Sequence, residues 1–134
     1  VLLRPDVKLF GAELWSRRRG LTPLPSEAAR DARFDCDFWS CVAKPTAPVR
    51  LAAAWNVRRP LRAGRLEEMC LGAELVILRN AFRPDSCAAP TVLTGADFAR
   101  GGSAELYRSG PGWRIVWAQD RRGRRPWTWG YDPR

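Results

Sequence analysis

ELVILR at residues 74–79 is the stretch that decides the fold of this chain. Four consecutive aliphatic side chains between two charged ones are typical of a strand that is buried on both faces of a sheet. The preceding residues 61–69 predict a short helix that Gly72 ends, with three side chains facing inward: Leu61, Leu66 and Met69. A helix that leads into a buried strand indicates βαβ-type layering.

Further short strands are predicted on both sides of this unit. Turn residues and alternating apolar positions place them at 34–37, 41–43, 49–55, 91–93, 104–108 and 113–118. The last two flank SGPG at residues 109–112 and predict a hairpin. Near the start, a helix is expected between Asp6 as N-cap and Gly20 as C-cap. Residues 21–32 are interpreted as a linker with one helical turn, and residues 95–102 as a turn or single helical turn.

The length of 134 residues fits one domain. We divide it into a strand end and helix (1–20), a core (33–119) and a basic aromatic tail (120–134). The predicted class is α/β or α+β, a layered mixed sheet of five to seven strands with two flanking helices. No apolar run approaches the roughly 18 residues that a membrane span needs. The chain begins at Val1, and we expect it to be a fragment of a longer protein.

Four cysteines allow two disulfides, one zinc site or four buried thiols. Their spacing disfavours zinc, because the later two, Cys70 and Cys87, do not form a close pair of ligands. We predict that Cys36–Cys41 closes a hairpin tip and that Cys70–Cys87 ties a helix end to a loop. Disulfides would place the domain outside the cytoplasm, whereas free thiols would fit a cytosolic protein.

The chain contains no histidine. This excludes histidine-based triads, histidine general bases and histidine-ligated zinc centres within it. A cysteine nucleophile would also lack its usual histidine partner. The carboxylate pairs Asp35/Asp37 and Glu67/Glu68 are interpreted as structural or surface groups, since nothing in the sequence marks a cleft around them. We therefore expect no catalytic residue, no metal, no cofactor and no small-molecule substrate.

The net charge is +9, and only Lys8 and Lys44 among the 23 cationic side chains are lysines. Such a charge favours polyanions, nucleic acid or an anionic membrane surface, although it can also serve solvation alone. The candidate DNA-contacting residues lie in the two densest cationic runs, because cations track phosphates and aromatic rings stack on unpaired bases. They are Arg17, Arg18 and Arg19 in the first run, and Arg121, Arg122, Arg124 and Arg125 with Trp127 and Trp129 in the second. The alternatives are a helix C-terminus that attracts cations for its dipole, and tryptophans that pack onto the domain.

A series of short segments follows one order along the chain: FDCD (34–37), CVA (41–43), EEMC (67–70), AELVI (73–77) and Cys87. In this order they resemble the far C-terminal part of ComEC-type competence proteins, membrane proteins thought to pass transforming DNA into the cell. FGAELW (10–15) is similar to the family's FAAENWLRRDG element. DFARGGSA (97–104) is similar to its DLWRxGAHA segment, and RGRRPW (122–127) to its RGxRPW ending.

The resemblance implies the later half of a degenerate metallo-β-lactamase-like domain. The zinc-binding histidines of the full family are missing, both at residues 80–82 after the buried strand and at Ala104-Glu105 in the GAHA segment. It therefore implies a non-catalytic accessory domain at the periplasmic face of the inner membrane, with DNA and the membrane channel of the same polypeptide as partners. The DNA would be single-stranded if the tail tryptophans stack on bases. The alternatives are a purely structural brace, or part of a metal-dependent nuclease whose ligands lie outside this chain.

Overall fold

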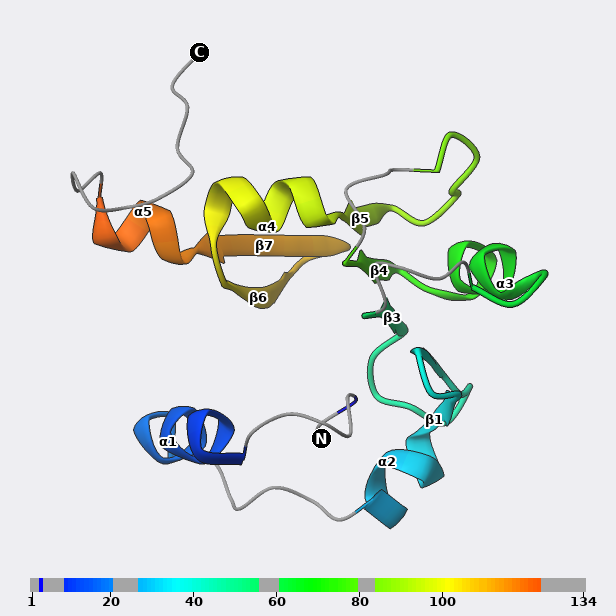
Figure 1. Ribbon diagram of the computed structural model, residues 1–134, viewed down its shortest axis with the longest axis horizontal. Helices are drawn as coiled ribbons and strands as arrows, with labels where there is room; N and C mark the ends of the chain where they lie inside the picture. Colours follow the sequence, from blue (N-terminus) through cyan, green and yellow to red (C-terminus); the bar gives the residue numbers. More distant parts are fainter. Residues whose placement is uncertain (1–2, 4–8, 21–26, 56–60, 80–83, 124–134) are drawn as a thin grey trace.

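The computed structural model describes residues 3, 9–20, 27–55, 61–79 and 84–123. Within them the chain forms a five-stranded mixed sheet, a separate two-stranded hairpin and short helices (Figure 1). In chain order the elements are α1 (Leu9–Arg18), α2 (Glu27–Arg33), β1 (Phe34–Cys36), β2 (Ser40–Ala43), β3 (Leu51–Ala54), α3 (Arg65–Gly72), β4 (Leu75–Leu78), β5 (Thr91–Leu93), α4 (Gly95–Gly101), β6 (Ala104–Ser109), β7 (Gly112–Trp117) and α5 (Ala118–Arg122). The predicted mixed α/β architecture is confirmed.

The large sheet has the strand order β1-β2-β3-β4-β5, so that every strand pairs with its neighbour in sequence. β1, β2 and β3 are antiparallel, whereas β3, β4 and β5 are parallel. Parallel neighbours need a crossover connection, and α3 lies in the one between β3 and β4. The βαβ unit predicted around residues 74–79 is therefore present.

β4 forms the centre of the core, because Leu75, Val76 and Leu78 are all at most 6% exposed. α3 packs on the sheet through Met69, which is completely buried, and Leu61 and Leu66 are half-buried against the same cluster. The predicted inward positions of this helix are thus confirmed. The helix itself begins later than predicted, at Arg65.

The hairpin of β6 and β7 is joined by a two-residue turn at Gly110 and Pro111, as predicted. Gly110 has φ of +55°, a conformation in which a side chain would be strained. α4 packs on this hairpin through Trp117, whose ring makes an edge-to-face contact with Phe98. Gly101 lies against the same indole so closely that an added Cβ would come within 2.3 Å of it.

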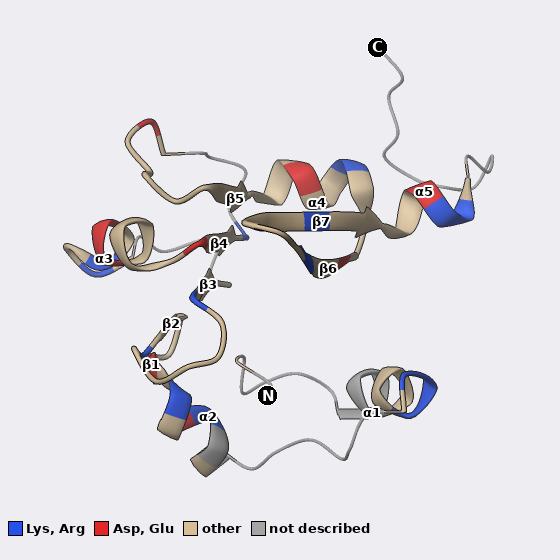
Figure 2. Cartoon of the chain, turned by 180° about the vertical axis from the view of Figure 1, so that it is seen from behind, with Lys and Arg blue, Asp and Glu red and all other residues tan. Residues whose placement is uncertain are grey.

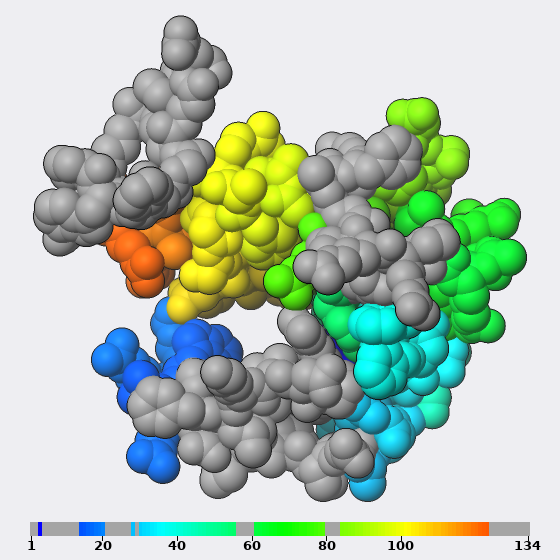
Figure 3. Space-filling view, in the orientation of Figure 1, coloured from blue at the N-terminus to red at the C-terminus, as the bar shows by residue number. Residues whose placement is uncertain are grey.

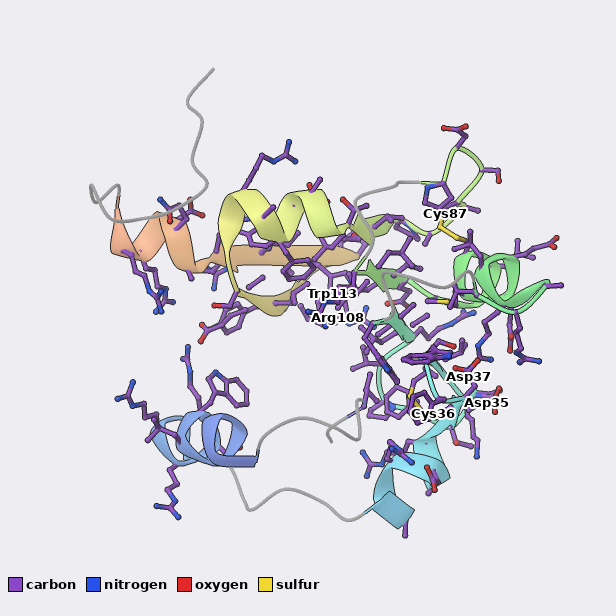
Figure 4. The ribbon with its side chains drawn as sticks, viewed as in Figure 1. Asp35, Cys36, Asp37, Cys87, Arg108 and Trp113 are labelled. Atoms are coloured by element: carbon purple, nitrogen blue, oxygen red, sulfur yellow. A yellow bond between two sulfur atoms is a disulfide. The ribbon has the colours of Figure 1, made fainter. Side chains whose placement is uncertain are left out.

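The hairpin meets the large sheet at a salt bridge between Arg108 and Glu74. The Arg108 guanidinium lies 2.7 Å from the Glu74 carboxylate and 5.1 Å from the centre of the Trp113 ring. Figure 4 shows Arg108 and Trp113 together beside β4. This contact is one link between β6, the strand that carries the candidate site, and the large sheet.

Both predicted disulfides are present. Cys36 and Cys41 are register partners in the β1–β2 hairpin, and their bond closes it. Cys70, near the end of α3, is bonded to Cys87 in the connection between β4 and β5. Free cysteines are absent, since all four lie in described segments. Disulfides of this kind are typical of an oxidising, extracytoplasmic compartment.

The helices differ most from the prediction, because the described residues form five helices, where two helices and single helical turns within 21–32 and 95–102 were expected. Residues 27–33 form a helix that runs directly into β1, residues 95–101 form two turns, and residues 118–122 form α5 at the start of the expected tail. No helix in the described segments is long and apolar enough to cross a membrane. The predicted strand end at residues 1–2, the N-cap Asp6 and the tail from residue 124 onward lie outside the described residues.

Candidate nucleic-acid interface

The described arginines of the two cationic runs predicted to contact DNA lie at the C-terminal ends of α1 and α5. Arg17 and Arg18 form the last turn of α1, and Arg19 follows directly. Arg121 and Arg122 form the last turn of α5. Cations suit both positions because a helix carries partial negative charge at its C-terminus. The helix dipole therefore explains why arginines are favourable at these positions. Tertiary structure must explain why arginines from both helix ends reach the same residue on β6.

The meeting point is Glu105 on β6. One carboxylate oxygen accepts a hydrogen bond from Arg19 Nη2, although the two residues are 86 positions apart. The other oxygen lies 3.7 Å from Arg121 Nη2 and accepts a 2.7 Å hydrogen bond from the Tyr107 hydroxyl. One acidic side chain thus joins the end of α1, the hairpin and α5. We call Arg19, Glu105, Tyr107 and Arg121 the arginine junction.

The positive environment of the junction acts strongly on Glu105. The hydrogen bonds from Tyr107 and Arg19, together with the charges of Arg19 and Arg121, lower the pKa of Glu105 to about 2. The same hydrogen bond raises the pKa of Arg19. Glu105 is therefore ionised throughout the physiological range, and the junction is a place where a negative charge is stabilised.

Arg114 on β7 extends this cationic surface. It is the register partner of Tyr107, and its guanidinium lies 4.8 Å from the centre of the Tyr107 ring. Sequence reasoning missed Glu105, Tyr107 and Arg114. A signal for them existed, because residues 105 and 107 share one face of a strand and a two-residue turn at 110–111 sets residue 114 opposite residue 107.

Of the remaining predicted residues, Arg17, Arg18 and Arg122 are described, and all three are exposed. Consecutive helix residues are rotated by about 100°, so Arg17 and Arg18 do not face Glu105 when Arg19 does. Figure 2 shows basic residues at the ends of both α1 and α5, and Figure 3 shows these helices flanking the segment that carries α4 and the hairpin. Arg124, Arg125, Trp127 and Trp129 lie outside the described residues. The structure therefore brings together Arg19 and Arg121, with Arg17, Arg18 and Arg122 nearby in sequence.

The carboxylates considered for acid–base chemistry form a different cluster, around Arg65. Figure 4 shows Asp35 and Asp37 close together, on the side of Cys36 that is nearer to α3. The Arg65 side chain is fully buried and donates 2.9 Å hydrogen bonds to the carboxylates of Asp35 and Glu68. It also bonds Ser40 Oγ at 2.9 Å and the Asp35 carbonyl at 2.8 Å. Glu67 is exposed on α3.

Asp37 holds the turn between β1 and β2. One of its carboxylate oxygens accepts hydrogen bonds from the Trp39 and Ser40 amides, at 2.8 and 2.6 Å, and from the Ser40 hydroxyl at 3.0 Å. Burial alone would raise the pKa of Asp37, but these hydrogen bonds and the charge of Arg65 outweigh it and lower the pKa below its usual range. A carboxylate held in its charged form by structural donors is a poor proton donor at neutral pH.

Among the described residues, no group of three cysteine, aspartate or glutamate side chains is placed to hold a metal ion. A cleft of about 460 Å³ lies between α4 and α5, and its lining includes Arg100, Trp117 and Asp120. None of the four junction residues lines this cleft. The junction and its cationic surroundings are thus the best candidate for ligand contact in the described part of the chain.

Comparisons with protein-family models, with curated proteins and with solved structures found no match for this chain.

Proposed function

We propose that this chain is a non-catalytic, extracytoplasmic domain of a ComEC-like DNA-uptake protein that contacts DNA through its phosphates. The observation that carries the proposal is the convergence of Arg19 and Arg121 on Glu105. One arginine from each of the two cationic runs reaches the same carboxylate, although the two arginines are about a hundred residues apart in the sequence. A continuous polyanion is the ligand that such a surface fits best, because it can contact several cations at once.

The resemblance to ComEC-type proteins supports the same function. Its segments fall on the elements that organise the fold: FDCD and CVA on β1 and β2, EEMC on α3, and AELVI on β4. On this proposal the mixed sheet with its crossover helix corresponds to the later half of a degenerate metallo-β-lactamase-like fold. The missing histidines support a role in guiding DNA without cutting it.

The two disulfides support a periplasmic position, at the outer face of the inner membrane. The remainder of the same polypeptide would then form the membrane channel beside which this domain lies. Elemental analysis of the purified protein tests the non-catalytic part of the proposal, with the expected result of no stoichiometric zinc or manganese. One equivalent of tightly held metal would favour a nuclease whose other ligands lie outside this chain.

The DNA contact is tested by fluorescence anisotropy with labelled single- and double-stranded oligonucleotides at about 50 and 200 mM salt. We expect binding that weakens steeply with salt and depends little on sequence, because phosphate contacts release counterions. Arg121→Glu should weaken binding about tenfold at low salt and reduce the salt slope by roughly one contact.

Arg33→Glu is the matched control. Arg33 is also an exposed arginine in the last turn of a short helix, so its reversal changes net charge and helix electrostatics by the same amount. α2, which carries it, lies far from α5 in Figure 1. Equal effects of the two charge reversals would show that DNA binding depends on the net charge of the domain and not on the position of Arg121. Absence of binding at low salt would leave a structural brace for the channel as the better function.

A further inference from the structure

The arginine junction has a feature that DNA contact alone does not require, namely a carboxylate at its centre. Glu105 accepts hydrogen bonds from one guanidinium and one phenol and lies within ion-pair distance of a second guanidinium. These donors are the ones that a phosphate oxygen takes in proteins. The carboxylate is about a quarter exposed, and the Arg121 side chain is 61% exposed, so an arriving anion has access to both.

We infer that Glu105 is a built-in competitor that occupies the place of a backbone phosphate and must be displaced before the junction can bind one. The inference rests on the proposed function and adds a threshold to it, the number of contacts that a ligand must make in order to bind. Because Glu105 is attached to the domain, its effective concentration at the junction is high and constant. Every external anion that uses Arg19 and Arg121 together therefore binds more weakly than it would without Glu105.

The consequence depends on how many other contacts the ligand makes. The need to displace Glu105 lowers the affinity of every ligand by the same factor, because Glu105 must release Arg19 and Arg121 before any ligand can bind them. A single phosphate has only the junction, and that factor is enough to keep it from binding. A chain of phosphates keeps its contacts to the exposed Arg17, Arg18, Arg114 and Arg122 and still binds. Glu105 thus raises the number of further contacts that a ligand needs before it binds at a given concentration, a threshold that a long polyanion passes and a single phosphate does not.

Competition does not vary over the physiological pH range, because the pKa of Glu105 is lowered to about 2 and its charge is always present. The rival role for Glu105 is positioning, in which it holds Arg19 and Arg121 in place for DNA. The two roles predict opposite results when its charge is removed. Loss of a competitor tightens binding, whereas loss of a positioning group weakens it.

The test is Glu105→Gln, which keeps the size of the side chain and one acceptor oxygen, removes its charge and replaces the other acceptor oxygen with an NH2 donor. Binding of labelled 6-nucleotide and 30-nucleotide oligothymidylates is measured by anisotropy across a salt series. We expect about tenfold tighter binding of both, the size of one regained charge-assisted contact. The salt slope should steepen by roughly 0.7, the value of one additional phosphate contact on a single strand.

The matched control is Glu67→Gln, which changes net charge equally at an exposed site on α3. Tyr107→Phe is a second variant, which removes the 2.7 Å hydrogen bond to Glu105 without changing any charge. It should give a smaller gain in the same direction.

Each outcome decides the inference. An equal gain in affinity from Glu67→Gln would show an effect of net charge and overturn the competitor role. Unchanged or weaker DNA binding by Glu105→Gln, while the wild type still binds DNA, would also overturn it. If neither the wild type nor any variant binds DNA at low salt, the proposed function fails first and the inference fails with it.

Discussion

Replacing Arg65 with methionine tests what holds the first hairpin to α3. The Arg65 side chain is completely buried and donates four hydrogen bonds, two to carboxylates and two to neutral oxygens. Methionine has a similar length and fills the space of the aliphatic stem, so the change isolates the guanidinium from its packing.

The magnitude follows from what each partner does after the change. The carboxylates of Asp35 and Glu68 are 60% and 46% exposed, so water replaces the guanidinium as their partner. The loss of both ion pairs together therefore costs less than about 1 kcal/mol. Ser40 is fully buried, and its hydroxyl oxygen and the Asp35 carbonyl lose donors at a cost of about 1 kcal/mol each. The expected total is about 3 kcal/mol of the free energy of unfolding.

Urea unfolding of the disulfide-intact protein, followed by tryptophan fluorescence, measures this loss. With a slope of about 2 kcal/mol per molar, the midpoint should fall by roughly 1.5 M. Arg62→Met is the control, because Arg62 is 61% exposed and lies 3.5–3.8 Å from carboxylates of the same cluster. It should cost less than about 0.5 kcal/mol. A loss below 1 kcal/mol for Arg65→Met, or equal losses for both variants, would refute the assignment of stability to the buried donors.

Three further results are expected. Replacing both Cys70 and Cys87 with alanine should lower the free energy of unfolding by about 3 kcal/mol, the entropy of a loop of this length; a thiol assay that finds four reactive groups in the untreated native protein would contradict this bridge. Gly101→Ala should lower the melting temperature through a cost of about 2 kcal/mol, because its Cβ would overlap the packed indole. Gly72→Ala, with open space around it, should be neutral or slightly stabilising, and equal melting shifts for the two would argue against the close packing. Carboxyl NMR should show Glu105 titrating near pH 2. Because its pKa is lower in the folded than in the unfolded protein, its contribution to stability is complete above about pH 4.3 and disappears as the pH falls toward 2. A titration midpoint near pH 4 would contradict the ion pair.

The parts of the fold that were predictable have strong local signals. Four aliphatic residues at 75–78 indicated the buried strand, and the SGPG turn at 109–112 indicated the hairpin. The disulfide pairing followed from placing each cysteine on an element. α2 was predicted only as one helical turn within a linker, and α5 was not predicted, because they have seven and five residues, too few to show an apolar period. The prolines before residue 27 also favoured a linker.

The candidate site was predictable only in its charges. The arginine runs stand out in the sequence, but their convergence depends on a contact between residues 19 and 105 that no local pattern encodes. Glu105 by itself is an ordinary polar position in an alternating strand. Its importance comes from its tertiary contacts with Arg19 and Arg121, which lie on other elements.

The sequential strand order has a consequence for how the chain acquires its disulfides. A polypeptide that emerges from a translocation pore with its N-terminus first presents Cys36 and Cys41 before the later cysteines, and the β1–β2 hairpin can form without any later segment. When Cys70 emerges, Cys36 and Cys41 are already bonded to each other, and the next thiol to emerge is that of its partner, Cys87. Oxidation in order of emergence therefore gives the native connectivity, and the domain can mature in an oxidising compartment without disulfide isomerisation.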